Sequence, residues 1–441
     1  MTTIDKPLPT IPLGTRDQLY LGSLGTRATR LCLGVGLLAL AGAAVLGAGE
    51  GDAMRQFLFG YLTAWCFFFS IAAASLFFVL AHHLFKASWS VVLRRLAETL
   101  ACNFIPLMVL LLPILFGLHR LYPWTSAAYM HSSADLQNKS GLLNEPFFLI
   151  RCLFYFILLI GLSWYFRRQS LAQDHDGRLS HLRALRWHSG WGFLALFWII
   201  NFIGADLVMT LQPRWLSYAA PLFFFSGVIM TIYAALPLLA MWLQRNGRLD
   251  NAITLDHYQD LARWLFAWMM FWMYIAFAQY MLIWYANIPQ ETSFFLVRDL
   301  QPWLWITLAL LFGHFIMPFL GLLPRWAKRN KRVLAFWCVW LLLFGYLDLF
   351  WQIMPAVWVN TPAGRVALQH VNAFDPYQLA PTARYLLWIP LSTSAILIDV
   401  LCLLGIGGLF LAHTFHLLRQ EALLPLKDPY LPSSLVFEEL V

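Results

Sequence analysis

The fold is decided by residues 258–291, which read YQDLARWLFAWMMFWMYIAFAQYMLIWYANIPQE. The 27 positions 264–290 within this stretch carry no charged side chain. An α-helix rises about 1.5 Å per residue and the apolar core of a bilayer is about 30 Å thick, so the stretch is long enough to cross a membrane. Trp264, Trp268 and Trp272 recur at every fourth position, and we expect this stripe to pack on helices or to face lipid.

The composition of the whole chain agrees with a membrane protein. Hydrophobic residues make up 60% of the sequence and charged residues 12%, whereas a soluble domain usually has about 25% charged residues. Because backbone groups inside lipid must be satisfied within the fold, only helices or closed barrels can span. The apolar runs are about 20 residues or longer, which favours helices. The sequence therefore predicts an all-α polytopic membrane protein.

Ten apolar runs predict ten transmembrane spans, with both termini in the cytoplasm. The first run follows Arg27 and Arg30 and has the small residues of a signal peptide, but we expect it to be a retained helix. Of the 30 Lys and Arg residues, 22 lie in the N-terminal segment, the tail and the alternate loops that join them on one side. The predicted spans are 31–49, 57–81, 97–118, 147–166, 190–211, 217–243, 264–287, 303–323, 333–355 and 387–412.

These spans predict a chain of two four-helix bundles with flanking helices. Two long connections, about 119–146 and 356–386, would lie on the side of the membrane opposite the cytoplasm. There they would form either a docking platform for a partner or an ordinary surface lid. The predicted segments are a cytoplasmic N-terminal segment (1–30), a first helix (31–56), a first bundle (57–211), a second bundle (217–355), a periplasmic loop (356–386), a tenth helix (387–412) and a cytoplasmic tail (413–441).

A sequence pattern that occurs twice supports the division into two bundles. The fifth span ends GADLVMTLQP and the ninth ends GYLDLFWQIMP. Asp206 and Asp348 are each followed by Leu and, seven positions on, by Pro213 and Pro355. Both spans are predicted to run outward, so both carboxyls would lie in the outer third of the membrane, in equivalent helices of a parallel repeat.

A few polar side chains within the spans are candidates for proton transfer. Ionisable groups inside lipid cost about 2.5–3.5 kcal/mol even on insertion scales, so each needs a partner or a role. The alternative is that each is an interhelical tie, and Glu98, one turn after Arg94, is expected to form a local ion pair with it. The proton-path candidates are Asp206, His314, Asp348, Asp399, Gln279 and Tyr280, with Asn201 nearby.

The sequence predicts no catalytic, metal-binding or cofactor-binding residue. The six Cys residues are scattered, without a Cys-x-x-Cys pair, and no Gly-rich phosphate loop precedes a helix. Of the 12 His residues, His314 alone is clearly deep within a span, so paired haem ligation is not expected. A cofactor-free membrane subunit is favoured.

Several runs resemble the ActF membrane subunits of alternative complex III, within the polysulfide-reductase/NrfD-like group. The chain departs from that pattern at Thr210, where Ser is usual, and at Arg214, where His is common. The matching runs, in chain order, are WSVVLRRLAETL (89–100), ADLVMTLQPRW (205–215), FAQYMLIWYANIPQE (277–291), GHFIMPFLGLLPRWAKRN (313–330), DLFWQIMP (348–355) and DPYLPSSLVFEEL (428–440).

This resemblance implies a scaffold and proton-path subunit of a quinol-oxidising complex in the bacterial inner membrane. It implies no redox centre in this chain, with haem c and iron–sulfur clusters in partner subunits and phospholipids bound. The implied partners are the sister membrane subunit ActC, periplasmic iron–sulfur and cytochrome c subunits and a terminal oxidase, with no nucleic acid. Two alternatives stay open: an NrfD-type anchor that binds quinol itself, and a proton-coupled secondary transporter with broken helices at its site.

Overall fold

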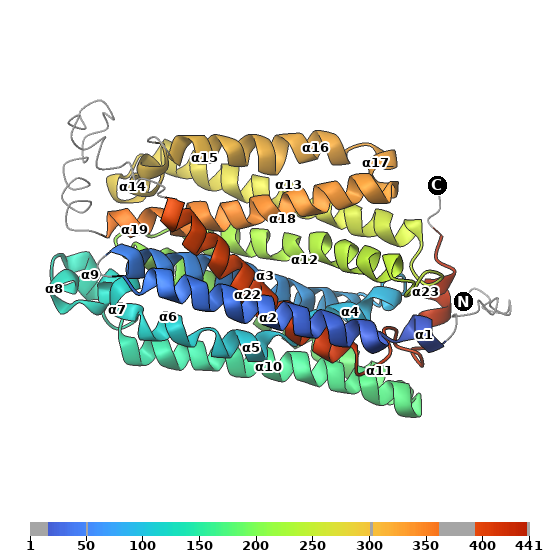
Figure 1. Ribbon diagram of the computed structural model, residues 1–441. Coiled ribbons are helices and arrows are strands. Elements are labelled where there is room, and N and C mark those ends of the chain that lie inside the picture. The colour runs from blue at the N-terminus through green and yellow to red at the C-terminus, as the bar shows by residue number, and fades with distance from the viewer. Residues whose placement is uncertain (1–15, 50–51, 300–302, 361–392, 439–441) are drawn as a thin grey trace.

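The computed structural model describes residues 16–49, 52–299, 303–360 and 393–438. These residues form helices joined by turns, with no strand among them (Figure 1). The prediction of an all-α polytopic membrane protein is confirmed. Parts of six predicted segments lie outside the described residues: 1–15 of the N-terminal segment, 50–51 of the first helix, 300–302 of the second bundle, 361–386 of the predicted periplasmic loop, 387–392 of the tenth helix and 439–441 of the tail.

Ten helical segments in the described part of the chain are long and apolar enough to cross a membrane. Each overlaps one predicted span. Several helices extend beyond their span, because helical backbone hydrogen bonds continue into polar residues, which hydropathy does not assign to a span. The segments are α2 (Gly22–Gly47), α3 (Asp52–Leu84), α4 to α6 (Val91–Ala101, Phe104–Val109, Leu112–Phe116), α10 (Glu145–Asp176), α11 with η2 and η3 (Leu179–Ile203, Gly204–Val208, Met209–Leu211), α12 (Ala219–Arg245), α13 (Leu255–Ala286), α15 with η4 and α16 (Trp303–Ala309, Leu310–Ile316, Met317–Leu322), α18 (Lys331–Ile353) and α22 (Thr393–Leu418).

Short helices gather at the two ends of these long ones. At one end lie α7 (Leu118–Leu121), η1 (Pro123–Thr125), α8 (Ala127–Met130), α9 (Ala134–Asn138), α14 (Pro289–Arg298) and α19 (Pro355–Val359); at the other lie α1 (Arg16–Leu19), α17 (Arg325–Arg329) and α23 (Leu431–Leu435) (Figure 1). At the end that contains α1 and α23, a hydrogen bond joins the C-terminal segment to α1: the Leu423 N–H donates to the Leu19 carbonyl at 2.8 Å. We call these the α14 end and the α23 end. That the α23 end is cytoplasmic stays a prediction.

The centre of the molecule is α3, not the stretch that decided the fold class. Within its most apolar window, 94% of the α3 residues are buried, against 28% for α13. Helix α3 packs against α4, α11, α12, α18 and α22 and so touches elements of both predicted bundles. Helix α13 lies further out, against α12, and many of its aromatic side chains face outward.

The first and last membrane helices form a close pair. A Cβ atom added to Gly408 of α22 would lie 2.5 Å from the Cα atom of Gly36 in α2. An added Cβ on Gly405 would lie 2.5 Å from Leu40 Cγ. Small residues that let two backbones touch are a common way for membrane helices to associate. The pair packs on α3 through α22.

Three of the membrane segments are irregular. The third is interrupted at residues 102–103 and 110–111, and Pro106 and Pro113 follow these two breaks. The fifth and eighth contain π-helical turns, which often mark functional positions because they widen the helix. Pro237, in contrast, is accommodated inside α12. Asp206 lies in the first π-helical turn and His314 in the second.

One predicted ion pair is wrong. Arg94 pairs with Asp428, Nη1 to Oδ2 at 2.7 Å, whereas Glu98 pairs with Arg95, Oε2 to Nε at 3.3 Å. A separation of four residues suits an Arg–Glu pair as well as three does. The C-terminal segment, far away in sequence, takes the Arg94 side chain instead.

Candidate functional site

Asp206 is neutralised by a cation and capped by a phenol. Arg151 of α10 forms a two-point contact with it: Nε lies 2.8 Å from Oδ2, and Nη2 lies 2.9 Å from Oδ1. The Tyr155 hydroxyl donates to Oδ2 at 2.9 Å. Because both carboxylate oxygens accept bonds, and one of the donors is a guanidinium, this geometry fits a structural tie between α10 and η2.

Asp348, in a regular turn of α18, has a different environment. Trp272 of α13 donates its indole N–H to Oδ2 at 3.2 Å, and the Gln352 amide donates to the same oxygen at 3.0 Å. The other oxygen, Oδ1, is buried without a hydrogen-bond partner among the described residues, and no ion pair involves Asp348 there. An added Cβ on Gly227 would lie 3.5 Å from Oδ2, so the carboxyl lies against α12.

A buried carboxylate without a cation is costly, whereas a neutral carboxyl with hydrogen-bond partners is not. Asp348 is only 2% exposed, and its two donors in the described part of the chain are uncharged dipoles. Such a group can hold a proton and release it when its surroundings change. The geometry at Asp348 therefore suits proton binding better than the geometry at Asp206 does.

His314 packs against the same Trp272 indole. Its ring centroid is 4.2 Å from that of Trp272, and Phe344 lies at 6.3 Å. His314 is fully buried, and within the described residues neither of its ring nitrogens has a hydrogen-bond partner. Trp272 thus touches both His314 and Asp348, and the structure brings these two candidates into one cluster.

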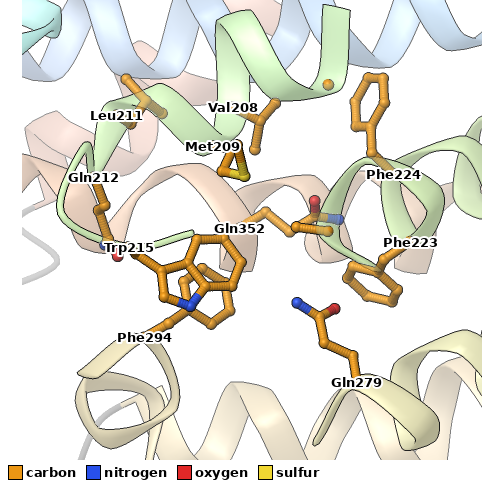
Figure 2. A pocket seen from close by; sticks show the side chains of 12 residues that line it. Val208, Met209, Leu211, Gln212, Trp215, Phe223, Phe224, Gln279, Phe294 and Gln352 are labelled. Carbon is orange, nitrogen blue, oxygen red and sulfur yellow. The ribbon is translucent and has the colours of Figure 1, made fainter. Parts of the chain in front are cut away.

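A small cavity lies beside this cluster, toward the α14 end. Its volume, counted as space open to the centre of a water molecule, is about 20 Å³, which is room for about one water. The amides of Gln279 and Gln352 both point toward it (Figure 2). The lining comes from η2, η3, the loop after η3, α12, α13, α14 and α18: Gly204, Val208, Met209, Leu211, Gln212, Trp215, Ala220, Phe223, Phe224, Gln279, Phe294 and Gln352.

Hydrogen bonds connect the cavity to Asp348. The Gln352 side chain lines the cavity and donates to the Asp348 carboxyl. Gln279, across the cavity, donates to the Ser217 hydroxyl at 3.2 Å. A water molecule in this space would lie one side chain away from the Asp348 carboxyl.

Arg298 fixes the end of α18 next to the cavity. It is fully buried and donates to three carbonyls: Nη1 to Phe294 at 2.7 Å, Nη2 to Gln352 at 2.8 Å and Nε to Trp351 at 3.0 Å. A cation at a helix C-terminus is favourable because it faces the negative end of the helix dipole. Burial lowers the pKa of the Arg298 guanidinium and raises that of the Asp299 carboxyl.

The remaining candidates lie apart from this cluster. Asp399 of α22 accepts from Gln56 at 3.1 Å on both oxygens, at the contact of α22 with α3. Tyr280 is 42% exposed and packs edge-on against Phe295, so it does not line the cavity. Asn201 donates to the Phe197 carbonyl of its own helix. The three aspartates therefore sit in three separate settings.

Sequence reasoning missed the partners of both bundle aspartates. Arg151 was visible as a cation inside the apolar run 147–166, but nothing assigned it to Asp206. Trp272 belonged to the aromatic stripe and was expected only to pack. Gln352 lies one turn after Asp348, which is the spacing for a contact along a helix.

The described residues contain no group of three or more His, Cys, Asp or Glu side chains placed to hold a metal ion. No known protein family matches the chain, and no curated protein matches it. The fold and the site define a multi-pass, all-α membrane protein with buried carboxyl groups.

Proposed function

We propose that this chain is an integral membrane subunit of a quinol-oxidising respiratory complex of the alternative complex III type, and that Asp348 carries a proton within it. Membership of the complex rests on the resemblance of six runs, of which 277–291 is the most specific. The proton role rests on one observation: the Asp348 carboxyl is buried, has no cation beside it in the described part of the chain and keeps one oxygen free.

The surrounding side chains support both protonation states of Asp348. The indole N–H of Trp272 and the amide of Gln352 stabilise the ionised form at Oδ2, while Oδ1 remains available to a proton. His314, which packs against Trp272, is the second ionisable side chain of the cluster. The cavity beside Gln352 has room for about one water, one side chain away from the carboxyl.

In this proposal the redox chemistry belongs to partner subunits. These are ActC, an iron–sulfur subunit and a cytochrome c subunit outside the membrane, together with a terminal oxidase, and the setting is the bacterial inner membrane. The folded short helices α7 to α9 and α14 offer these partners a surface at the α14 end. This chain would then position the partners and couple proton movement to their turnover.

Purification of the tagged chain in a mild detergent tests membership of the complex. We expect it to copurify with c-type haem and iron–sulfur subunits and with quinol oxidase activity. Isolation as a single polypeptide that takes up solute in liposomes would contradict the proposal and favour the secondary transporter.

Proton movement tests the role of Asp348 separately. In vesicles containing the assembled complex, Asp348→Asn should lower proton movement per electron while quinol oxidation continues. The control is Tyr280→Phe, which removes a hydroxyl from the exposed side of α13 and leaves the cluster of Asp348, Trp272 and His314 intact. Equal proton movement in wild type and Asp348→Asn would contradict the role even if the complex copurifies.

A second candidate function is quinol binding by this chain. The cavity supports it because an NrfD-type anchor would need a pocket near Asp206, and the cavity lies there. Met209 and Gln212 of the lining follow Asp206 closely in sequence, and Trp215 stacks on Phe294 at 3.9 Å beside them. The volume of about 20 Å³ suits water, so a quinol ring would require Trp215 or Phe223 to move. Photolabelling of Met209 by a quinone analogue would support this candidate.

A further inference from the structure

A second buried polar cluster lies at the α23 end, far from the cavity. Its members come from three helices: His83 of α3, Arg95 and Glu98 of α4, and Gln173 of α10. Each is at most 2% exposed. Helix α4 is itself buried along its whole length, although two arginines and a glutamate lie on it. We call these four residues the α4 cluster.

Contacts with Ser170 and Asp174 tie the α4 cluster to α10. Arg95 donates from Nη2 to Asp174 Oδ2 at 2.7 Å and to Ser170 Oγ at 3.1 Å. Its Nε lies 3.3 Å from Glu98 Oε2, close enough for an ion pair. His83 lies against Phe166, with a ring centroid separation of 5.7 Å, one turn before Ser170 on α10.

Apart from the ion pair between Arg95 and Glu98, several polar atoms of the α4 cluster have no hydrogen-bond partner among the described residues. These atoms are both ring nitrogens of His83, Nη1 of Arg95 and the amide nitrogen of Gln173. Each unsatisfied buried group costs about 1–3 kcal/mol, more when it is charged. Native proteins usually satisfy such groups with ordered water.

The α4 cluster contains both hydrogen-bond donors and acceptors and both charge signs, which favours bound water over a bound ion. Glu98 offers acceptors and would repel an anion, whereas Arg95 offers donors and would repel a cation. The imidazole of His83 needs one donor and one acceptor when it is neutral. Water supplies both roles, and it can satisfy His83, the Gln173 amide and Nη1 of Arg95 alike.

The C-terminal segment 422–438 covers this end of α4. Asp428 pairs with Arg94 at 2.7 Å, with both side chains buried. Ser434 donates to the Trp89 carbonyl at 2.6 Å and accepts from the Val92 N–H at 3.3 Å, just before and within the first turn of α4. The Lys427 N–H donates to Asp174, which also binds Arg95.

We propose that the α4 cluster is an internal site that binds ordered water, and that segment 422–438 closes it from the aqueous phase through the Arg94–Asp428 pair. The site is independent of the proton role of Asp348. In this proposal segment 422–438 separates the water bound at the α4 cluster from bulk water.

Radiolytic hydroxyl labelling of the full chain in lipid nanodiscs tests the water site. Side chains beside bound water are labelled rapidly, so His83 and Phe166 should be labelled several-fold faster than Phe59 and Phe69, which are fully buried in the same α3 helix. Labelling of His83 and Phe166 at the rate of Phe59 and Phe69 would overturn the water site.

Mixing with ¹⁸O-water before irradiation tests the cover. Asp428→Asn weakens the pair with Arg94, so ¹⁸O should appear in labelled His83 several-fold sooner than in wild type. Glu438→Gln makes the same chemical change at an exposed position of the same segment and should leave the exchange time unaltered. Equal exchange times in the two variants would contradict the proposal that segment 422–438 closes the site. The labelling pattern of the wild type tests the water site separately, even if Asp428→Asn folds poorly.

Discussion

Asp206 and Asp348 occupy matching places in the sequence and opposite electrostatic settings in the structure. Each precedes a Leu and, seven residues later, a Pro, near the end of its helix. Asp206 is held by Arg151 and Tyr155, whereas Asp348 is held by two uncharged donors and keeps one oxygen free. A similar sequence pattern therefore carries an ion-paired carboxyl in one half of the molecule and, in the other half, a carboxyl with only uncharged donors among the described residues.

The backbone differs at the two positions as well. Asp206 lies in the π-helical turn η2, which is packed closely on α12: an added Cβ on Gly204 would lie 2.8 Å from Phe224. Asp348 lies within the regular helix α18. The comparison shows that Asp206 has a cation beside it, whereas Asp348 has none among the described residues, and the proposed proton role of Asp348 rests on this difference.

The largest expected effect is that of Asp206→Asn on stability. Removing one member of a buried ion pair leaves the other charge unpaired and costs about 3–5 kcal/mol. We expect a clear loss of thermal stability of the purified protein in detergent, well beyond that of Asp348→Asn. The double variant Asp206→Asn with Arg151→Met should recover part of the loss, and a double variant as unstable as the sum of its parts would contradict the tie.

The next effect in size is that of Trp272→Phe. The change deletes the N–H that binds Asp348 but keeps an aromatic ring against His314, so the lost hydrogen bond should cost about 1–3 kcal/mol. In a double-mutant cycle with Asp348→Leu, most of this cost should disappear because the acceptor is gone. Additive losses of unfolding free energy would show that Trp272 acts through packing alone.

A smaller effect on stability is expected for Asp348→Asn, about 1 kcal/mol or less, because the amide oxygen can still accept from Trp272 and Gln352. The same variant should lose proton movement per electron in the assembled complex. Thermal unfolding and proton release, measured on one preparation, check both statements. A stability loss as large as that of Asp206→Asn would mean that the two carboxyls are equivalent.

The smallest effect is expected for Tyr280→Phe. The side chain is 42% exposed and does not line the cavity, so stability and proton movement should match those of the wild type. This variant is a control for removing a hydroxyl from α13. A marked fall in proton movement would place the path on the outer face of that helix, away from Asp348.

The sequence predicted the ten spans because hydropathy over about 20 residues is a strong signal. It could not predict that α3 is the central helix, since Ala72, Ala73 and Ala74 look like any apolar run, nor that Gly36 and Gly408 touch. The carboxyl positions were found because charge is rare in lipid. Their partners were not, because Arg151 and Trp272 reach Asp206 and Asp348 from helices far away in sequence, and no local pattern encodes that contact.

Difference infrared spectroscopy of the assembled complex tests the central claim most directly. Addition of quinol should change the C=O band of a protonated carboxyl group, and Asp348→Asn should remove that band while Tyr280→Phe leaves it. The same band in Asp348→Asn as in wild type would contradict the assignment of the exchangeable proton to Asp348.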